Sequence, residues 1–204
     1  MKSVAIKQTK DKIADMIRSD ILSGVLKSGD ELIQEQVAEQ TGLSRMPVRE
    51  AFQTLEQEGL LLRLPNRHMR VIEIMDINIR QYFTTLVALE QSFFGQLIAA
   101  KSKTDNIVSA LEKAIDGNAL HDEFDSHIAP ASALDNEYLL GIHVKMLSSF
   151  YLYTLRHFWK PSCTNESLRT ILNGVKKADE NMIGEGLRSY FAYYEKCMLK
   201  GKVL

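Results

Sequence analysis

Apolar residues in the first part of the chain change from a helical to a strand period. Val48, Phe52 and Leu55 recur at intervals of four and three, the spacing of residues on one buried face of a helix. From residue 60 to residue 72 the side chains instead follow the two-residue period of a strand, on either side of the turn-forming residues 65–68. The pattern predicts a helix followed by a two-stranded β-ribbon.

A second helix precedes this one at the spacing of a helix-turn-helix. Ala38 is small enough for two helices to cross closely, and Gly42 accepts the left-handed backbone of a tight turn. Ser44 is a good N-cap for the following helix, and Pro47 falls in its first turn, where a missing N–H costs little. Residues 33–71 are therefore predicted to form helix, turn, helix and ribbon.

Capping and helix-ending residues divide the rest of the chain into six segments with apolar stripes. The predicted helices cover residues 76–101, 104–117, 120–129 with an end at Pro130, 135–159 with an end at Pro161, a fifth starting at Thr164, and 180–200 after the cap Asp179. Six helices without a strand predict an antiparallel bundle. The expected fold is mostly α: a winged helix-turn-helix domain of three helices plus a β-hairpin wing in residues 1–73, and an all-helical domain in residues 76–204.

Cationic side chains gather on the predicted second helix and its ribbon. Arg45, Arg49 and Gln53 share one outward face of the helix, and two arginines with an amide suit base edges in a major groove. The full set expected to contact double-stranded DNA is Ser44, Arg45, Met46, Pro47, Arg49 and Gln53 on the helix with Arg63, Asn66, Arg67, His68 and Arg70 on the ribbon. The cluster predicts duplex DNA binding.

Composition supports binding through such a local cluster. Lys and Arg number 25 against 26 Asp and Glu, so the chain has no overall basic character to attract nucleic acid. Cys163 and Cys197 form no CxxC motif and are expected to be reduced. The first residues lack the apolar core of a signal peptide, and no run reaches membrane-spanning length. We expect a cytoplasmic protein without a membrane partner.

Three motifs in this region resemble those of the GntR family of winged-helix regulators. They read GVLKSGDEL in residues 24–32, GLSRMPVREA in residues 42–51 and EGL in residues 58–60, and the resemblance covers residues 7–72. It implies that Arg45 and Arg49 contact DNA and that Ser44 binds a phosphate. It also implies that Asn66, Arg67 and His68 reach toward the minor groove. A homodimer on a palindromic operator follows from it, with repression as the family's usual mode.

Two positions depart from the GntR pattern. Glu35 stands where many members carry arginine, so one contact to DNA is expected to be missing. His68 stands at the wing tip, where glycine is usual, and is expected to change the minor-groove contact.

The helical segment resembles, in order and length, the FCD ligand-sensing domain of the FadR branch in its six-helix, VanR-like form. That family holds a divalent metal with one Asp and three His. The nearest match places His121 and Asp125 at the first two ligand positions, with their types exchanged, and Leu168 and Tyr190 at the other two. Because leucine cannot bind a metal, no metal or other cofactor is expected, and His121 and Asp125 are only weak ligands.

Without a metal, a small-molecule effector would be held by side chains alone. The polar residues expected near the bundle axis are Glu90, His121, Asp125, His143, Arg169 and Tyr190. Phe150, Tyr151, Tyr153, Phe158 and Trp159 are expected to pack in the core and the dimer contact rather than form a ligand cage.

Three classes of function are consistent with these patterns. The favoured one is a transcriptional regulator, a repressor, that responds to a small-molecule effector. The second is a metal-dependent enzyme using His121, Asp125, His127 and His143, but the chain has no HExxH, phosphate loop or nucleophile elbow. The third is a DNA-binding architectural or adaptor protein whose helical domain only dimerises. The expectation is therefore a protein that is not an enzyme.

Overall fold

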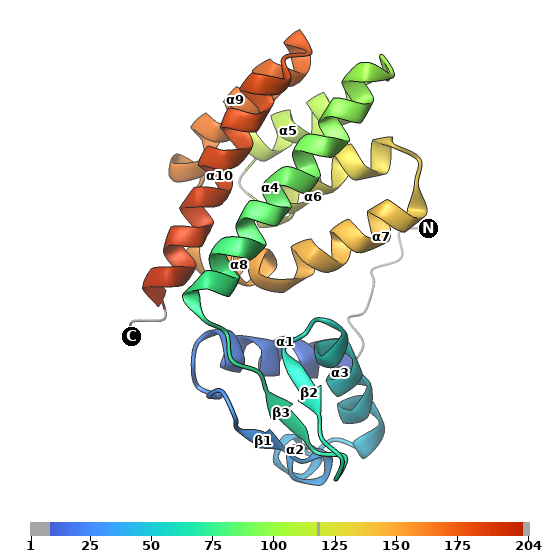
Figure 1. The fold of residues 1–204 in the computed structure, drawn as a ribbon, viewed down its shortest axis with the longest axis vertical. Helices are drawn as coiled ribbons and strands as arrows, with labels where there is room; N and C mark the ends of the chain where they lie inside the picture. The colour runs from blue at the N-terminus through green and yellow to red at the C-terminus, as the bar shows by residue number, and fades with distance from the viewer. Residues whose placement is uncertain (1–8, 118, 202–204) are drawn as a thin grey trace. The chain divides into compact units, whose positions relative to one another are not determined.

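The computed structural model describes residues 9–117 and 119–201, which form two compact units that divide between Met75 and Asp76 (Figure 1). The first unit contains α1 (Thr9–Leu22), β1 (Glu31–Leu32), α2 (Gln34–Thr41), α3 (Arg45–Gln57), β2 (Leu61–Arg63) and β3 (Met69–Val71). The second contains α4 (Asp76–Ala99), α5 (Asp105–Asp116), α6 (Leu120–Ala133), α7 (Glu137–Met146), a π-helical turn (Leu147–Tyr151), α8 (Leu152–Phe158), α9 (Pro161–Lys177) and α10 (Glu180–Gly201). The mostly helical architecture predicted from the sequence is confirmed.

The helix-turn-helix of the first unit forms as the sequence predicts. Val48, Phe52 and Leu55 of α3 are fully buried, and α3 packs against α1 and α2. Gly42 ends α2 in the left-handed conformation, with φ 67° and ψ 22°. Because glycine has no Cβ, it adopts this conformation without a steric clash, and the chain can turn sharply between α2 and α3.

The wing is part of a three-stranded sheet rather than the two-stranded ribbon that the sequence predicts. Strand β3 lies in the centre, antiparallel to β2 on one side and to β1 on the other. Glu31 and Leu32 of β1 lie opposite Arg70 and Met69 of β3. The pattern missed β1 because a strand of two residues is too short to show a period.

A buried ion pair that the sequence did not indicate fixes α1 against the end of α3. The Arg18 guanidinium donates to both carboxylate oxygens of Glu58, at 2.8 and 2.6 Å. Paired donors and acceptors of this geometry bind more strongly than a single charge contact. The pair therefore orients α1 relative to α3.

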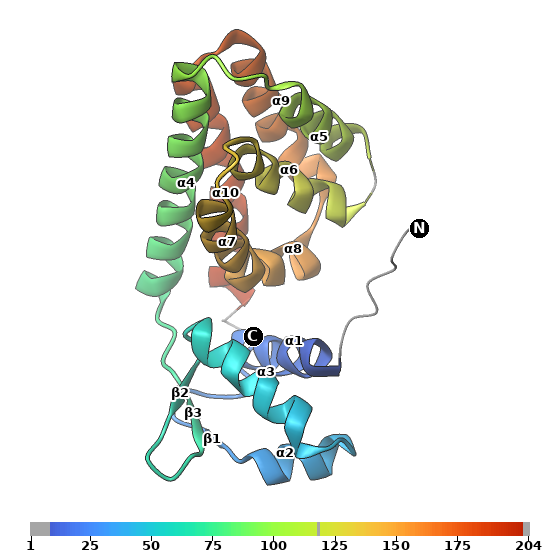
Figure 2. The same ribbon diagram turned by 90° about the vertical axis from the view of Figure 1, so that its right-hand side faces the viewer.

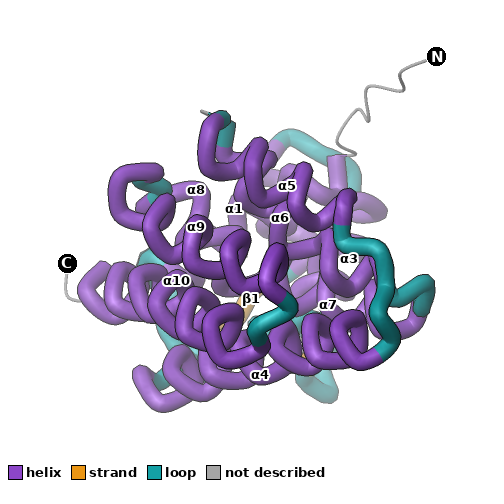
Figure 3. The backbone as a smooth tube through the Cα atoms, turned by 90° about the horizontal axis from the view of Figure 1, so that it is seen from above, coloured by secondary structure: helices purple, strands orange, loops and turns teal. Residues whose placement is uncertain are grey.

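The second unit is helical throughout its described residues, and Figure 3 shows helix (purple) in nearly all of it. Helix α10 lies beside both α4 and α9, and α5 packs on α6 and α9 (Figure 2). Among the described helices, none has the length and apolar character needed to cross a lipid bilayer.

Three predicted helix boundaries in this unit are wrong. Helix α6 continues through Pro130 to Ala133. Proline removes one backbone hydrogen bond from the helix, but Pro130 and Ala131 remain buried against neighbouring helices, and this packing maintains the helix. The predicted helix over residues 135–159 is instead α7, the π-helical turn and α8. Helix α9 begins at Pro161, in the first-turn position that proline favours, rather than at Thr164.

The break between α7 and α8 is held by one tyrosine of α4. Ser149 has a non-helical backbone, with φ −91° and ψ −119°. The Tyr82 hydroxyl donates to the Met146 carbonyl at 2.6 Å and accepts from the Tyr151 N–H at 3.2 Å. It thereby partners backbone groups on both sides of the break, and it fixes where Tyr151 enters the core.

Helices α9 and α10 approach each other at glycines, and we expect Gly186→Ala to destabilise the protein by about 1–2 kcal/mol. A Cβ at Gly186 would lie 2.9 Å from the Ile171 backbone nitrogen and 3.0 Å from the Ser167 carbonyl oxygen. The backbone must shift, and alanine's better helix propensity offsets only part of that strain. Urea unfolding measures the change.

Gly141 of α7 provides the matched control for this substitution. It is an exposed helical glycine with nothing within 4 Å of an added Cβ. Gly141→Ala should leave stability unchanged or raise it by about 0.5–1 kcal/mol. Equal effects of the two substitutions would contradict the close contact between α9 and α10.

Candidate nucleic-acid interface and buried polar cluster

The start of α3 presents polar side chains to solvent. Ser44 takes the N-cap position with an extended backbone, but its side chain makes no capping hydrogen bond. Arg45, Met46, Arg49 and Gln53 are exposed, and Pro47 is partly exposed in the first turn. The structure therefore brings these six predicted residues together on the outward side of α3, with the Ser44 hydroxyl not used as a cap.

An acidic residue of α2 opposes one of these arginines. Glu35 Oε1 lies 3.2 Å from Arg45 Nη1, and both side chains are exposed. At the position where the GntR pattern usually has arginine, this chain thus carries a carboxylate that pairs with α3. A contact of Arg45 with DNA would require this pair to separate or would bring Glu35 close to phosphate.

We expect Glu35→Gln to tighten binding to a duplex by about three- to tenfold at low salt, because it removes a negative charge next to the phosphate backbone. It also releases Arg45 from its partner. Fluorescence anisotropy at several salt concentrations measures the change, and Glu39→Gln, on an exposed face of the same helix, is the control. A Glu35→Gln protein that binds more weakly than the parent would show that Glu35 itself is needed for the contact.

The wing tip is ordered by its own polar side chains. Asn66 Oδ1 accepts from the His68 N–H at 3.0 Å, and His68 Nδ1 lies 3.1 Å from Glu31 Oε2 of β1. Arg67 sits at the tip with a left-handed backbone, φ 68°, and an exposed side chain. His68 is therefore turned back onto β1, while Arg67 is the cation that the tip presents.

The remaining arginines of the wing differ in whether they form an ion pair within the protein. Arg63 Nη2 lies 2.7 Å from Glu56 Oε2, and this hydrogen bond raises the pKa of the Arg63 guanidinium. Arg70 of β3 is exposed. Within the described part of the chain, Arg49, Arg67 and Arg70 form no ion pair. These three arginines are the ones whose charge is available to a duplex.

A second polar feature lies inside the helical unit. Glu90 of α4 accepts from His127 Nδ1 of α6 at 2.8 Å and from His143 Nε2 of α7 at 3.1 Å. Burial alone would raise the pKa of Glu90, but the charge and hydrogen bonds of His127 and His143 outweigh it, and the pKa lies below its ordinary value. A buried carboxylate thus links three helices.

Half of the predicted effector residues belong to this cluster. Glu90, His143 and Tyr190 are fully buried, and His127 joins them, with its ring centre 4.4 Å from that of Tyr190. His121, Asp125 and Arg169 are exposed, so their expected placement near the bundle axis is wrong. The side chain of His121 is 74% exposed, 3.3 Å from Asp122.

The error comes from the orientation of α6. This helix buries Glu123, Ser126, His127 and Pro130. The acid and imidazole four residues apart that face the core are therefore Glu123 and His127, two positions later than the predicted pair. A single helix with polar residues on several faces does not indicate which face its neighbours cover.

Glu123 is the second buried carboxylate. Burial raises the pKa of this side chain, and Thr164, His127, Tyr190 and Trp159 lower it only in part. Neither of its oxygens has a hydrogen-bond partner among the described residues, and the same holds for Thr164 Oγ1, Tyr194 OH and His127 Nε2. Unpartnered polar atoms in such number are rare in a packed core.

These side chains do not fit a divalent metal. Both oxygens of Glu90 already accept from histidines, and Leu168 and Tyr190 are fully buried where two further ligands would be needed. The described residues contain no group of three or more His, Cys, Asp or Glu side chains able to hold a metal ion. The four residues of the hydrolase alternative are also not assembled, since His121 and Asp125 lie on the surface.

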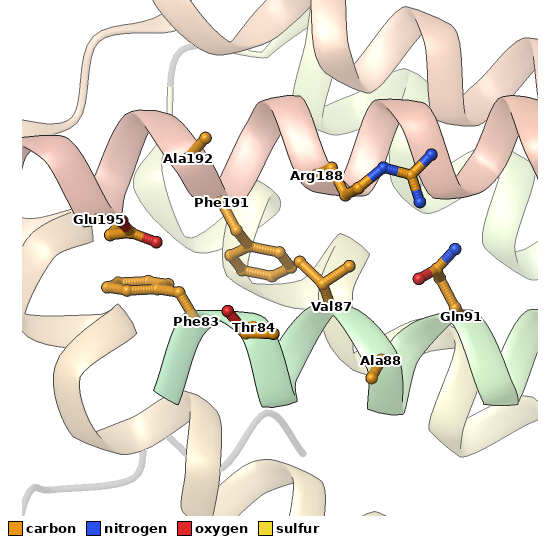
Figure 4. Close-up of a pocket in the computed structure, with 9 residues that line it drawn as sticks. All are labelled: Phe83, Thr84, Val87, Ala88, Gln91, Arg188, Phe191, Ala192 and Glu195. Atoms are coloured by element: carbon orange, nitrogen blue, oxygen red, sulfur yellow. The ribbon is translucent and has the colours of Figure 1, made fainter. Parts of the chain in front are cut away.

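A groove runs between α4 and α10 on the outside of the helical unit (Figure 4). Its volume is about 340 Å³. The lining is Phe83, Thr84, Val87, Ala88 and Gln91 from α4 with Arg188, Phe191, Ala192 and Glu195 from α10. Glu195 also pairs with Arg80 of α4, at 3.1 Å. The groove is apolar along its middle and has opposite charges on α10.

The fold and exposed cations of the first unit are those of a winged helix-turn-helix DNA-binding domain. Residues 9–71 match the family described as "Bacterial regulatory proteins, gntR family". The first unit is thus similar to the winged helix-turn-helix domain of the GntR family, over the residues that carry its motifs.

Similar proteins include regulators over part or most of the chain. A gluconate operon transcriptional repressor of Bacillus licheniformis is 28% identical over 52% of this chain and 42% of its own length. The Uxu operon regulator of Haemophilus influenzae is 25% identical over 96% of this chain and 82% of the regulator. The chain spans 64% of the length of a further relative, an HTH-type regulator of Agrobacterium vitis.

A solved structure shares the whole fold. Lar, described as controlling expression of the Listeria monocytogenes agr system, has a TM-score of 0.66 and 16% identity, over 96% of this chain and 98% of Lar. At this identity the likeness concerns the fold alone. The folds of both units therefore also occur together in the single chain of Lar.

Proposed function

We propose that this protein is a sequence-specific DNA-binding transcriptional repressor whose helical unit binds a small-molecule effector. The observation that carries the proposal is the exposed face of α3, where Arg49 and Gln53 follow a serine whose hydroxyl is not used as a cap. Such a face matches base edges and phosphate in a major groove. The names of the gluconate and Uxu relatives support the regulatory role.

The mode of binding that we propose uses two protomers. Each places α3 in one of two successive major grooves of a short palindrome, while Arg67 and Asn66 of the wing reach toward the minor groove. Arg49 reads a base edge, and guanine O6 and N7 suit its guanidinium best. Arg70 and Ser44 contact phosphates and set the position of the protein on the duplex.

Selection from a pool of randomised duplexes with the full chain tests this function. We expect enrichment of one inverted repeat, whose two halves match because the dimer is two-fold symmetric. No enrichment over several rounds, at a salt concentration where a random duplex is still bound, would contradict sequence-specific recognition.

We propose that the two protomers pair through the groove between α4 and α10. Arg188 and Glu195 stand equally far along α10 on either side of Phe191 and Ala192. A two-fold axis near Phe191 and Ala192 would therefore place Arg188 opposite the partner's Glu195, and Glu195 opposite the partner's Arg188. Ala88 and Ala192 are exposed and small, which permits close approach of the helices.

Charge reversal tests this pairing by sedimentation velocity. Arg188→Glu should raise the dimer dissociation constant about tenfold or more, because it opposes two carboxylates, and adding Glu195→Arg should restore the dimer. Arg80→Ala, which removes the partner of Glu195 within the chain, is the control and should leave the dimer intact. A dimer that tolerates Arg188→Glu would place the interface elsewhere.

A helical unit that only dimerises would not explain the buried carboxylates in its interior as well as an effector-binding unit does. A structural core does not need two buried carboxylates, one of them without any hydrogen-bond partner among the described residues. Buried polar atoms of this kind are expected where a ligand binds. We therefore favour an effector-binding unit over a purely structural one.

A further inference from the structure

We propose that the helical unit binds a small organic cation, a primary or quaternary ammonium, at Glu123, among the rings of Tyr151, Tyr190, Tyr194 and Trp159. This inference names the chemical class of the effector and rests on the proposed function. It differs from the metal that the family resemblance implied, because it uses one carboxylate and aromatic faces instead of a ligand set.

Glu123 is a buried carboxylate whose hydrogen-bonding capacity the described residues leave unused. The residue is 2% exposed, and neither of its carboxylate oxygens has a hydrogen-bond partner in the described part of the chain. A buried carboxylate without a partner is strongly unfavourable unless an opposite charge or a donor reaches it. A ligand that carries N–H donors or a positive charge would supply what the protein does not.

No buried lysine or arginine of the described helical unit balances the charge of Glu123. Among the described residues of the helical unit, no lysine or arginine is buried, and the buried arginine, Arg18, belongs to the other unit. The N–H groups of His127 Nδ1 and His143 Nε2 are both given to Glu90. The charge of His127 offsets the effect of burial on the pKa of Glu123 only in part, and an anionic ligand would meet two carboxylates.

Three tyrosines lie close enough to Glu123 to interact with it, and their rings pack against one another. The ring centres of Tyr190 and Tyr194 are 5.3 Å apart, those of Tyr151 and Tyr194 are 5.5 Å apart, and the Tyr151 and Tyr190 hydroxyls share a hydrogen bond of 2.7 Å. The negative faces of such rings attract an ammonium group. The Tyr194 hydroxyl has no hydrogen-bond partner among the described residues, so it remains available to the ligand's own polar atoms.

Trp159 connects this buried cluster with the partly exposed surface of the helical unit. Trp159 lies between α8 and α9, is only partly buried, and is close enough to Glu123 to lower the pKa of that carboxyl. At Trp159 the cluster therefore reaches a partly exposed side chain. Tryptophan is also the aromatic side chain that binds cations best. A ligand entering here would pass the indole before it reaches the carboxylate.

The test measures the melting temperature of the full chain with four probes at millimolar concentration: propylammonium, choline, propionate and zinc chloride. We expect propylammonium or choline to raise the melting temperature, and propionate and zinc to leave it unchanged. Stabilisation by propionate or zinc without stabilisation by either ammonium, or no stabilisation by any probe, would overturn the proposal.

Variants locate the site. Glu123→Gln, of nearly the same shape, should abolish the ammonium-dependent shift, whereas Asp125→Asn, an exposed carboxylate on the same helix, should keep it. If Glu123→Gln does not fold, Trp159→Leu at the partly exposed position serves instead, with an expected loss of about fivefold or more in ammonium affinity. A full shift in the variant that folds would overturn the assignment to this cluster.

The outcomes separate this inference from the proposed function. DNA selectivity without any ammonium effect would leave the repressor standing and remove the cationic effector. Ammonium binding that does not change DNA affinity would leave the site standing and remove its role as an effector site, since a ligand shifts an equilibrium only by its differential affinity for two states.

Discussion

Replacing Glu90 by alanine should lower the free energy of unfolding by about 3–5 kcal/mol, the largest stability effect that we expect from one substitution. Glu90 is fully buried and accepts hydrogen bonds from His127 and His143. Its removal would leave two buried imidazole N–H groups without an acceptor and open a cavity between α4, α6 and α7. Urea unfolding followed by circular dichroism measures the loss.

Two control variants distinguish the loss of the Glu90 hydrogen bonds from a general effect of substitution. Glu90→Gln keeps the shape and one acceptor, and should cost less than half as much as Glu90→Ala. His121→Ala removes an exposed imidazole beside Asp122 and should change stability by less than about 0.5 kcal/mol. A Glu90→Ala protein as stable as the His121→Ala protein would contradict the buried network.

The acid limb of the stability curve should also depend on Glu90. Because its pKa in the folded protein is lowered, the carboxylate stabilises the fold fully above its ordinary pKa, and this stabilisation is lost as the pH falls through the lowered value. The difference in stability between the parent and Glu90→Gln should therefore shrink on acidification below about pH 4.

Arg49→Ala should weaken binding to the selected duplex by about 1–3 kcal/mol, roughly five- to 150-fold, and relax its preference at one base pair. Arg49 is exposed on α3 and has no ion-pair partner among the described residues, so its charge and both terminal nitrogens are available to a base edge. Fluorescence anisotropy on the selected duplex and on single-base variants of it measures both effects.

Arg67→Ala in the wing is the comparison for this loss. The Arg67 side chain is exposed at the tip of a left-handed turn and should contact the minor groove without reading a unique base pattern. Its removal should weaken binding to selected and scrambled duplexes by similar factors. The same uniform loss in Arg49→Ala would mean that α3 does not read the sequence.

The winged helix could be predicted almost completely because its signals are local. Val48, Phe52 and Leu55 define the buried face of α3, and Gly42 permits a tight turn with positive φ directly after α2. The pairing of Glu35 with Arg45 could not be predicted, because it depends on how α2 and α3 cross. The two-residue strand β1 has no pattern of its own, since its position follows from pairing with β3.

The side chains that point into the interior of the helical unit could not be predicted from the sequence alone. Polar residues at several positions of α6 allow more than one face to turn inward, and packing against the neighbouring helices selects Glu123 and His127 rather than His121 and Asp125. The break at Ser149 depends on the Tyr82 hydroxyl, which lies 64 residues from its Met146 partner. Tertiary contacts, not local preference, decide both features.

Methylation protection of guanine N7 on the selected duplex is the most direct test of the central claim, that α3 enters the major groove and reads bases there. We expect the bound parent protein to protect guanines at symmetric positions in the two half-sites, because Arg49 occupies N7 and O6. We expect Arg49→Ala, at a concentration that saturates the duplex, to leave those same guanines reactive. Protection that persists unchanged in Arg49→Ala, or guanines that stay reactive under the bound parent protein, would contradict it.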